Sequence, residues 1–256
     1  MDLNLPPNEG DERDAAILQR VSRGDHDPLR WVAVHSTQGG HTAEFYVFAD
    51  ALQMDGVRVN VSAELSQQIA DTYGCSLLTP KIADLLWAQR TINLHPFPRG
   101  NTDGMDTTAA MIEHSAKIDA ALAGHDTSGA LIATVGKHWV LDNDLVGKKG
   151  GEDGGAMNYG WHFEGDSFEG LHGGVSATLM KDSRGSYVRM IQDRGHRHNF
   201  KHTDYSQTCV LVSRGCYVDG EMRDLLDVFQ DAALAGLASH QGVLRVLRQP
   251  DVPLYP

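Results

Sequence analysis

Cysteine is scarce in this chain, and the few copies exclude a disulfide-stabilised protein class. The 256 residues contain three cysteines, Cys75, Cys209 and Cys216, and no CxxC pair joins any two of them. Small secreted proteins that depend on disulfides carry a denser and even-numbered set. We therefore expect free thiols, with Cys209 a small core residue in the apolar run TCVLV.

Long hydrophobic runs and basic clusters are also missing. No segment approaches the roughly 20 apolar residues of a membrane span. The N-terminal MDLNLPPNEGDERD lacks the basic and apolar parts of a signal peptide. Lys and Arg number 22 against 34 Asp and Glu, which gives a formal net charge of −12. Because phosphates and anionic lipids attract clustered basic residues, we expect neither a nucleic-acid nor a membrane partner. The expected location is the cytoplasm, with export by a route that needs no signal peptide as the alternative.

The order of predicted elements indicates an α+β fold, with a mostly antiparallel sheet and helices packed on one side. The polar segment 1–30, with three prolines, predicts a flexible N-terminal arm, and residues 31–256 are expected to form a single domain. Alternating or continuous apolar runs predict strands at 31–35, 43–49, 57–61, 131–135, 139–141, 158–163, 187–191 and 208–212. Capping residues and helical periodicity predict helices at 62–73, from residue 79, and at 108–122, 221–229 and 232–238.

The segment RGHRHNFKHTDYSQTCVLVS, which begins at Arg194, gathers the side chains best suited to proton transfer or metal binding. His196 and His198 lie two residues apart, so an extended backbone places them on one side. With Asp204 they form a possible zinc triad with an open fourth position, and His162 or His172 could complete it. A solvated loop that is rich in histidine is the simpler interpretation of the same residues.

Cys75 is the second candidate. It lies in YGCSLLTP, just before the helix that Thr79 is expected to cap. A thiol near a helix N-terminus or an imidazole has a lowered pKa, and the thiolate is the attacking species. Cys75 as nucleophile, His198 as base and Asp204 as the residue that orients the base would form a catalytic triad. A buried cysteine that only fills space is the alternative.

Aromatic and polar residues around two short motifs are candidate substrate-binding groups. Gly160 in NYGWH would let a substrate approach the backbone between aromatic side chains, although a bulged strand explains the same letters. The substrate-binding candidates are Tyr159, Trp161, His162, Tyr205 and Ser206.

Several short motifs resemble an uncharacterised family of bacterial proteins. They are GHTAEFYVFADAL, VRVNV with QQIAD, GCSLLTPKIAD, YGWH and DYS, and they span about residues 35–235. The family pattern places a histidine after DYS, where this chain has Gln207. The resemblance supports the choice of residues and implies no reaction. In addition, WVAVHSTQGG resembles the first strand of zinc-dependent peptidoglycan amidases, in which a histidine, here His35, ends the strand.

These observations lead to a hydrolase of amide or peptide bonds, with cell-wall peptide as one possible substrate. The expected site is Cys75, His198 and Asp204, with no cofactor. A zinc-dependent hydrolase built on His196, His198 and Asp204 is the first alternative. A non-catalytic module that binds carbohydrate or peptide is the second. The sequence leaves the oligomeric state open.

Overall fold

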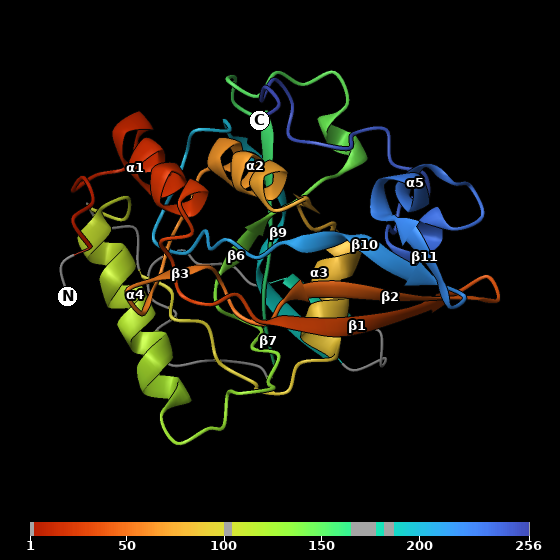
Figure 1. Cartoon of the computed structure of the whole chain (residues 1–256), viewed down its shortest axis with the longest axis horizontal. Helices are drawn as coiled ribbons and strands as arrows, with labels where there is room; N and C mark the ends of the chain where they lie inside the picture. Colours follow the sequence, from red (N-terminus) through yellow and green to blue (C-terminus); the bar gives the residue numbers. More distant parts are fainter. Residues whose placement is uncertain (1–2, 100–103, 165–177, 182–186, 256) are drawn as a thin grey trace.

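The computed structural model describes residues 3–99, 104–164, 178–181 and 187–255. The chain forms a single α+β domain in which the paired strands are antiparallel (Figure 1). Its α-helices are α1 Asp11–Ser22, α2 Ala63–Thr72, α3 Pro80–Ala88, α4 Thr108–Leu122 and α5 Leu225–Gln230. Two short 3-10 helices cover Asn143–Leu145 and Ala235–Leu237.

The strands form two main sheets and a small hairpin. The first sheet has the order β1-β2-β10-β11, and β5 also pairs with β10. The second has the order β6-β7-β9-β8, and β3 pairs with β4 alone. The strands are β1 Trp31–Gln38, β2 His41–Phe48, β3 Gln53–Met54, β4 Val57–Arg58, β5 Cys75–Ser76, β6 Lys137–Trp139, β7 Ala156–Glu164, β8 Thr178–Lys181, β9 Tyr187–His198, β10 Val212–Val218 and β11 Glu221–Asp224.

Helix α3 lies between the two main sheets, since it contacts β1 of the first and β7 of the second. Its start is fixed by Thr79, whose Oγ1 accepts a hydrogen bond from the Ile82 backbone N–H at 3.1 Å, and by Pro80 in the first turn. All of its residues except Lys81 are buried. A helix that is buried around its whole circumference belongs to the interior of a domain. The core therefore extends from both sheets onto α3.

Helix α1 corrects the expectation of a loose N-terminal arm. Ile17 and Val21, four residues apart, are buried on the face of α1 that meets α2. The Arg13 guanidinium donates to the backbone carbonyl of Asp106 at 2.8 Å. Three acidic residues in the first turn also suit the positive end of the helix dipole. This apolar spacing was the signal that the polar composition of the segment obscured.

Four other predicted elements differ from the structure. Residues 131–135 contain only an isolated bridge at Ile132, and residues 208–211 contain only an isolated bridge at Thr208 and precede β10. In place of one helix at 221–229, β11 pairs with β10 across a turn at Asp219 and Gly220, and α5 follows. Only Ala235–Leu237, in 3-10 form, is helical in the predicted helix 232–238. Residues 221–224 are a strand and not a helix because their backbone pairs with β10.

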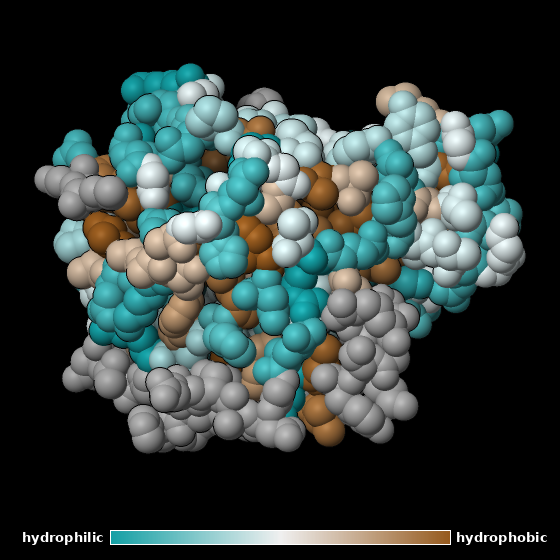
Figure 2. All heavy atoms as spheres, turned by 90° about the horizontal axis from the view of Figure 1, so that it is seen from below, coloured by the Kyte–Doolittle hydropathy of each residue, from teal (hydrophilic) through white to brown (hydrophobic). Residues whose placement is uncertain are grey.

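The large hydrophobic side chains that are exposed among the described residues are Trp31, Val146, Leu179, Tyr217, Met222, Val243 and Leu254. Figure 2 shows hydrophobic side chains reaching the surface among hydrophilic ones in the central part of the face that it displays. Such scattered exposure is normal for folded proteins. None of the helices within the described ranges combines the length and the apolar character needed to cross a bilayer.

Replacing Ile17 by alanine tests whether α1 is part of the folded domain. Because Ile17 is fully buried, Ile17→Ala is expected to lower the free energy of unfolding by about 2–4 kcal/mol. Urea denaturation followed by circular dichroism measures this change. Gln19→Ala, on the exposed side of the same helix, is the control and should change stability little. Equal stability of the two variants would mean that α1 does not contribute to the core.

Candidate active site

The candidate site is centred on the Asp84 carboxylate, which lies in the middle of α3. The Asp84 side chain is about nine-tenths buried. A carboxylate in such a position is stable only when hydrogen bonds and opposite charges replace its hydration. The structure provides these partners from two distant parts of the chain, β7 and the loop after the 3-10 helix Ala235–Leu237.

Three donors converge on this carboxylate. Asp84 Oδ1 accepts a hydrogen bond from the Tyr159 hydroxyl at 2.7 Å and lies 2.9 Å from His162 Nε2. Asp84 Oδ2 lies 2.8 Å from His240 Nε2. Burial by itself would raise the pKa of Asp84, but the bonds from His162, His240 and Tyr159 hold that pKa below its ordinary value. Asp84 is therefore ionised, and each imidazole presents its Nε2–H to it.

An irregularity in β7 places Tyr159 and His162 on the same carboxylate. Side chains of a regular strand alternate, so two residues three apart should point to opposite faces. Here Gly160 has φ +107° and Trp161 has φ +57°, and the pairing of β7 with β9 shifts register on both sides of Asn158. The two left-handed residues reverse the alternation. Glycine is required at position 160 also because a Cβ there would lie 3.3 Å from His138 Cδ2.

His162 is held in place from several sides. Its ring stacks on Trp87 of α3, with 5.8 Å between the ring centroids and an interplanar angle of 16°. Thr134 Oγ1 donates to its backbone carbonyl at 2.7 Å, and Thr134 itself has φ +68°. A β-branched residue in the left-handed region is a strained outlier, and such strain concentrates at functional sites. The tightly packed His162 can orient Asp84 but has little freedom to move.

His240 differs from His162 because it reaches solvent. Its side chain is 56% exposed, whereas that of His162 is 5% exposed. Since Nε2 donates to Asp84, Nδ1 carries the lone pair, and no hydrogen bond occupies Nδ1 among the described residues. An imidazole that a buried carboxylate orients and that keeps one nitrogen available has the arrangement that general-base catalysis requires.

A cavity of about 280 Å³, the Asp84 pocket, opens beside this pair. Its walls are Pro80, Asp84, Asp142, Tyr159, Met190, Asp193, Arg194, Ser239, His240 and Gln241. Asp142 is buried and accepts hydrogen bonds from Gln241 Nε2 at 2.9 Å and from the Asp144 backbone N–H at 2.9 Å. The Arg194 guanidinium, 40% exposed, lies 3.3 Å from the carboxylates of Asp142 and Asp144. The pocket therefore combines a base, a cation and an excess of carboxylates.

Cys75 lies outside this pocket, on β5. It is buried, and its Sγ lies 3.6 Å from the backbone carbonyl of Tyr73. Burial raises the pKa of the Cys75 thiol to about 12. No hydrogen bond or ion pair joins Cys75 to His198 or Asp204 anywhere in the described ranges. The three residues of the expected triad are thus not brought together as a nucleophile with its base, and the raised pKa opposes thiolate formation.

The histidines of the 196–204 segment do not form the expected zinc triad. His198, at the end of β9, stacks on His202 with 4.0 Å between ring centroids, and burial lowers its pKa to about 4. Across the described part of the chain, no three His, Cys, Asp or Glu side chains are grouped closely enough to hold a metal ion. His196 therefore has no ligand set in these ranges, and His172 lies outside the described residues.

Asp204 belongs instead to a buried ion pair. Its Oδ2 lies 2.6 Å from Lys137 Nζ, and its Oδ1 accepts from the Ser206 hydroxyl at 2.6 Å and from the Ser206 backbone N–H at 2.8 Å. Burial would raise the pKa of Asp204, but Lys137 and Ser206 hold it below its ordinary value. This pair connects β6 to the segment that leads into β10, which is a structural task.

The five predicted substrate-binding residues are divided between two places. Tyr159 and His162 contact Asp84, and Tyr159 also lines the pocket. Trp161 points to the other side of β7, where its ring and that of Tyr205 both pack against His114. Trp161, Tyr205 and Ser206 are almost completely buried.

Asp84 and His240 were not among the residues singled out from the sequence. Asp84 had one usable signal: it is an acidic residue in PKIADLLWA, a helix that is otherwise apolar except for Lys81. His240 stands in SHQG and had no such signal. The two lie 156 positions apart, and nothing in the spacing indicates that they meet. His35 is not the end of its strand, since β1 continues to Gln38, and its side chain is 64% exposed beside Glu44.

Comparison with protein-family models finds no match, and no curated protein or solved structure is similar to the chain.

Breaking the buried ion pair is expected to destabilise the fold. Lys137→Met leaves the Asp204 carboxylate buried without its cation, which should lower the free energy of unfolding by about 3–5 kcal/mol. Urea denaturation at pH 7 measures this change. In the double variant Lys137→Met with Asp204→Leu the uncompensated charge is gone, so much of the loss should be recovered. A double variant as unstable as the single one would contradict this account.

Acidification should destabilise the protein through two buried histidines. Burial lowers the pKa values of His114 and His138 to about 3. The unfolded chain, in which a histidine has a pKa of about 6.5, binds protons that the folded chain rejects, so stability falls as the pH drops from about 6.5 toward 3. The loss at pH 5 is on the order of 2 kcal/mol for each residue.

Urea denaturation at pH 7.5 and pH 5.0 checks this expectation. His114→Phe should show a smaller difference between the two pH values than the unsubstituted protein does. Asp204 contributes to stability in a lower pH range. Because its pKa in the folded state is lowered, its contribution is fully present above the unfolded pKa of about 3.9 and is lost as the pH falls through the folded pKa. An undiminished pH difference in His114→Phe would exclude His114 as a cause.

Proposed function

We propose that the protein is a hydrolase of amide bonds in which His240, oriented by Asp84, activates a water molecule. The supporting observation is the 2.8 Å contact between His240 Nε2 and Asp84 Oδ2 on a ring that is half exposed and lines the Asp84 pocket. This arrangement differs from the Cys75 mechanism expected from the sequence, but it retains the reaction class.

The proposed reaction uses His240 first as a base and then as an acid. His240 Nδ1 takes a proton from water as the water oxygen forms a bond to the substrate carbonyl carbon. The ionised Asp84 stabilises the imidazolium that results. The proton then passes from His240 to the amide nitrogen as the carbon–nitrogen bond breaks, which releases an acid and an amine. Arg194 is the cation of the pocket that can stabilise the oxyanion between these two steps.

Tyr159 and His162 are positioning residues in this scheme. Both donate to the Asp84 oxygen that His240 does not use, so they fix the plane of the carboxylate. Burial, together with the neighbouring Asp84 charge, raises the pKa of the Tyr159 hydroxyl. Tyr159 therefore remains a neutral donor and does not compete as a base.

The lining of the pocket favours a small substrate that carries an amino group. Asp142 and Asp193 add two carboxylates to Asp84, while Arg194 is the one Lys or Arg side chain among the lining residues. A cavity of about 280 Å³ is at the lower end of the range for ligand pockets. Peptides with a free amino group fit these properties, and cell-wall peptides are one class that provides them.

Replacing His240 and Asp84 tests this function. The substrates are aminoacyl and dipeptidyl p-nitroanilides with free amino groups, and the readout is kcat/KM. His240→Gln and Asp84→Asn should each lower kcat/KM about 10²–10⁴-fold, because general-base catalysis contributes that much. His35→Gln, at an exposed histidine on β1, is the matched control and should keep full activity.

Two further variants separate this proposal from its rivals. Cys75→Ala should retain activity, whereas its inactivity together with an active His240→Gln would favour a thiol nucleophile. Loss of activity with a zinc chelator, restored by zinc, would favour a metallohydrolase. Tight binding of the peptides with no turnover would favour a binding module, and in that case the proposed hydrolysis is wrong.

A further inference from the structure

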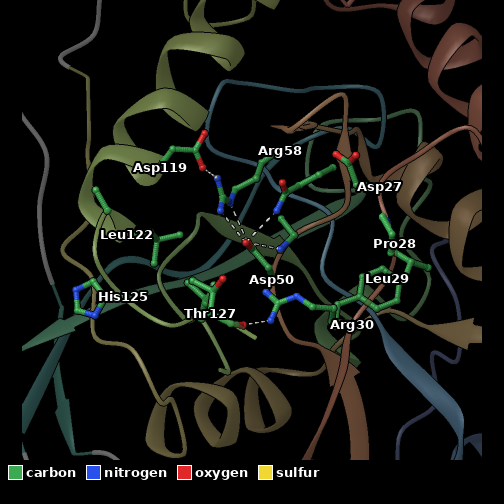
Figure 3. A pocket seen from close by; sticks show the side chains of 15 residues that line it. Asp27, Pro28, Leu29, Arg30, Asp50, Arg58, Asp119, Leu122, His125 and Thr127 are labelled. Carbon is green, nitrogen blue, oxygen red and sulfur yellow. Dashed lines mark hydrogen bonds and ion pairs between the residues drawn. The ribbon is translucent and has the colours of Figure 1, made fainter. Parts of the chain in front are cut away.

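A second and larger cavity lies away from the Asp84 pocket. Its volume is about 540 Å³, and it shares no lining residue with the Asp84 pocket. It opens between the segment before β1, the β3-β4 hairpin and the C-terminal end of α4 (Figure 3). Its lining includes the apolar residues Leu29, Phe48, Leu122 and Ile132.

The polar floor of this cavity is an ion-pair network in which the Arg58 guanidinium pairs with two carboxylates. Arg58 Nε and Nη2 donate to the two oxygens of Asp50 at 2.9 and 2.7 Å, and Arg58 Nη1 donates to Asp119 at 2.6 Å (Figure 3). Asp50 also accepts from the Ala51 backbone N–H and from the Gln53 side chain. Both Arg58 and Asp50 are buried. The Arg58 guanidinium is thus committed to these two carboxylates, and the floor as a whole carries one net negative charge.

Arg30, which lines the same cavity, differs from Arg58 because it has no ion pair with any described residue. Its guanidinium donates to the backbone carbonyl of Thr127 (Figure 3). No carboxylate lies within ion-pair distance of it among the residues that the structure describes. A guanidinium has five N–H donors in a planar fork that matches a carboxylate. Arg30 therefore keeps unused N–H donors and its positive charge in a cavity that also has apolar lining residues.

Each of the three carboxylates that line the cavity already has a partner. Asp119 and Asp50 are paired with Arg58, and Asp27 Oδ2 accepts the Gly56 backbone N–H at 2.7 Å. Of the two arginines that line the cavity, Arg30 is the one without a counter-ion in the described part of the chain. A ligand that supplies both a counter-ion and apolar surface would satisfy what this cavity lacks.

We propose that this cavity, the Arg30 pocket, binds a small organic acid, with the carboxylate on Arg30 and the apolar body against Leu29, Phe48, Leu122 and Ile132. The binding contains no chemical step and does not rest on the function proposed for the Asp84 pocket. The role of His240 and the occupancy of the Arg30 pocket can each fail without the other.

Three probes with the same aromatic ring test the ligand class on the full chain. Phenylacetate carries the carboxylate, phenethylamine carries an ammonium group, and benzyl alcohol is neutral. Titrations followed by ¹H–¹⁵N NMR should show saturable shifts for phenylacetate, with amides of residues around Arg30 and Thr127 affected. Absence of saturable binding by phenylacetate, or equal or tighter binding of phenethylamine, would overturn the proposal.

Variants of the pocket test its location. Arg30→Gln should weaken phenylacetate binding about tenfold, because a charge-assisted bond is lost. Arg23→Gln, at an exposed arginine beyond the end of α1, is the matched control and should bind as the unsubstituted protein does. Unchanged affinity in Arg30→Gln would overturn the assignment of the carboxylate.

A second variant guards against a folding defect in Arg30→Gln. Ala123→Phe, at an exposed position of the cavity lining, fills the pocket without changing any charge and should abolish the phenylacetate shifts. Asp84→Asn should leave them unchanged, which separates this test from that of the proposed hydrolysis. Full binding by Ala123→Phe would place the ligand elsewhere and contradict the proposal.

Discussion

The structure around the candidate site depends on one buried charge, the carboxylate of Asp84. Its desolvation would be strongly unfavourable without partners. Tyr159, His162 and His240 supply three hydrogen bonds and thereby connect α3, β7 and the C-terminal loop. The pKa of Asp84 is lowered because these hydrogen bonds outweigh the effect of burial, which would raise it. The buried carboxylate is therefore stable only when α3, β7 and the C-terminal loop come together around it.

The two faces of β7 have separate tasks because the strand is irregular. With regular alternation, Tyr159 and Trp161 would share a face and His162 would lie opposite. The left-handed backbone at Gly160 and Trp161 instead directs Tyr159 and His162 to Asp84 and directs Trp161 to His114. The same irregularity therefore forms the polar site on one face and an aromatic cluster on the other. The strain at Trp161 is compensated by contacts on both faces.

Local signals made some of the fold predictable. Helices α2 and α3 were predicted because the capping residues Ser62 and Thr79 stand before clear apolar periodicity. The prediction of a helix at 221–229 failed because its first residues form β11, which follows a turn at Asp219 and Gly220 and pairs with β10. For α1, a polar composition concealed two buried positions.

For the candidate site, sequence analysis found the residues that carry a local motif and missed those that do not. Tyr159 and His162 stand in one conspicuous segment, so they were named, although their joint contact with Asp84 depends on a backbone irregularity. Asp84 and His240 meet only through folding, and no spacing rule connects them. Cys75 and His198 were named for their chemistry, but reactivity depends on exposure and neighbouring charge, and both of these are set by the tertiary structure.

His240 follows the strands of both main sheets along the chain, and this order has a consequence in time. Asp84, Tyr159 and His162 are all made earlier during synthesis, and both main sheets can pair once β11 has left the ribosome. The exposed imidazole follows β11 by 16 positions, counted from Asp224 to His240. A nascent chain that has not reached His240 would therefore hold the Asp84 carboxylate without this contact, and the Asp84 pocket would become complete only after His240 is made. On the function proposed above, such a shorter chain is inactive.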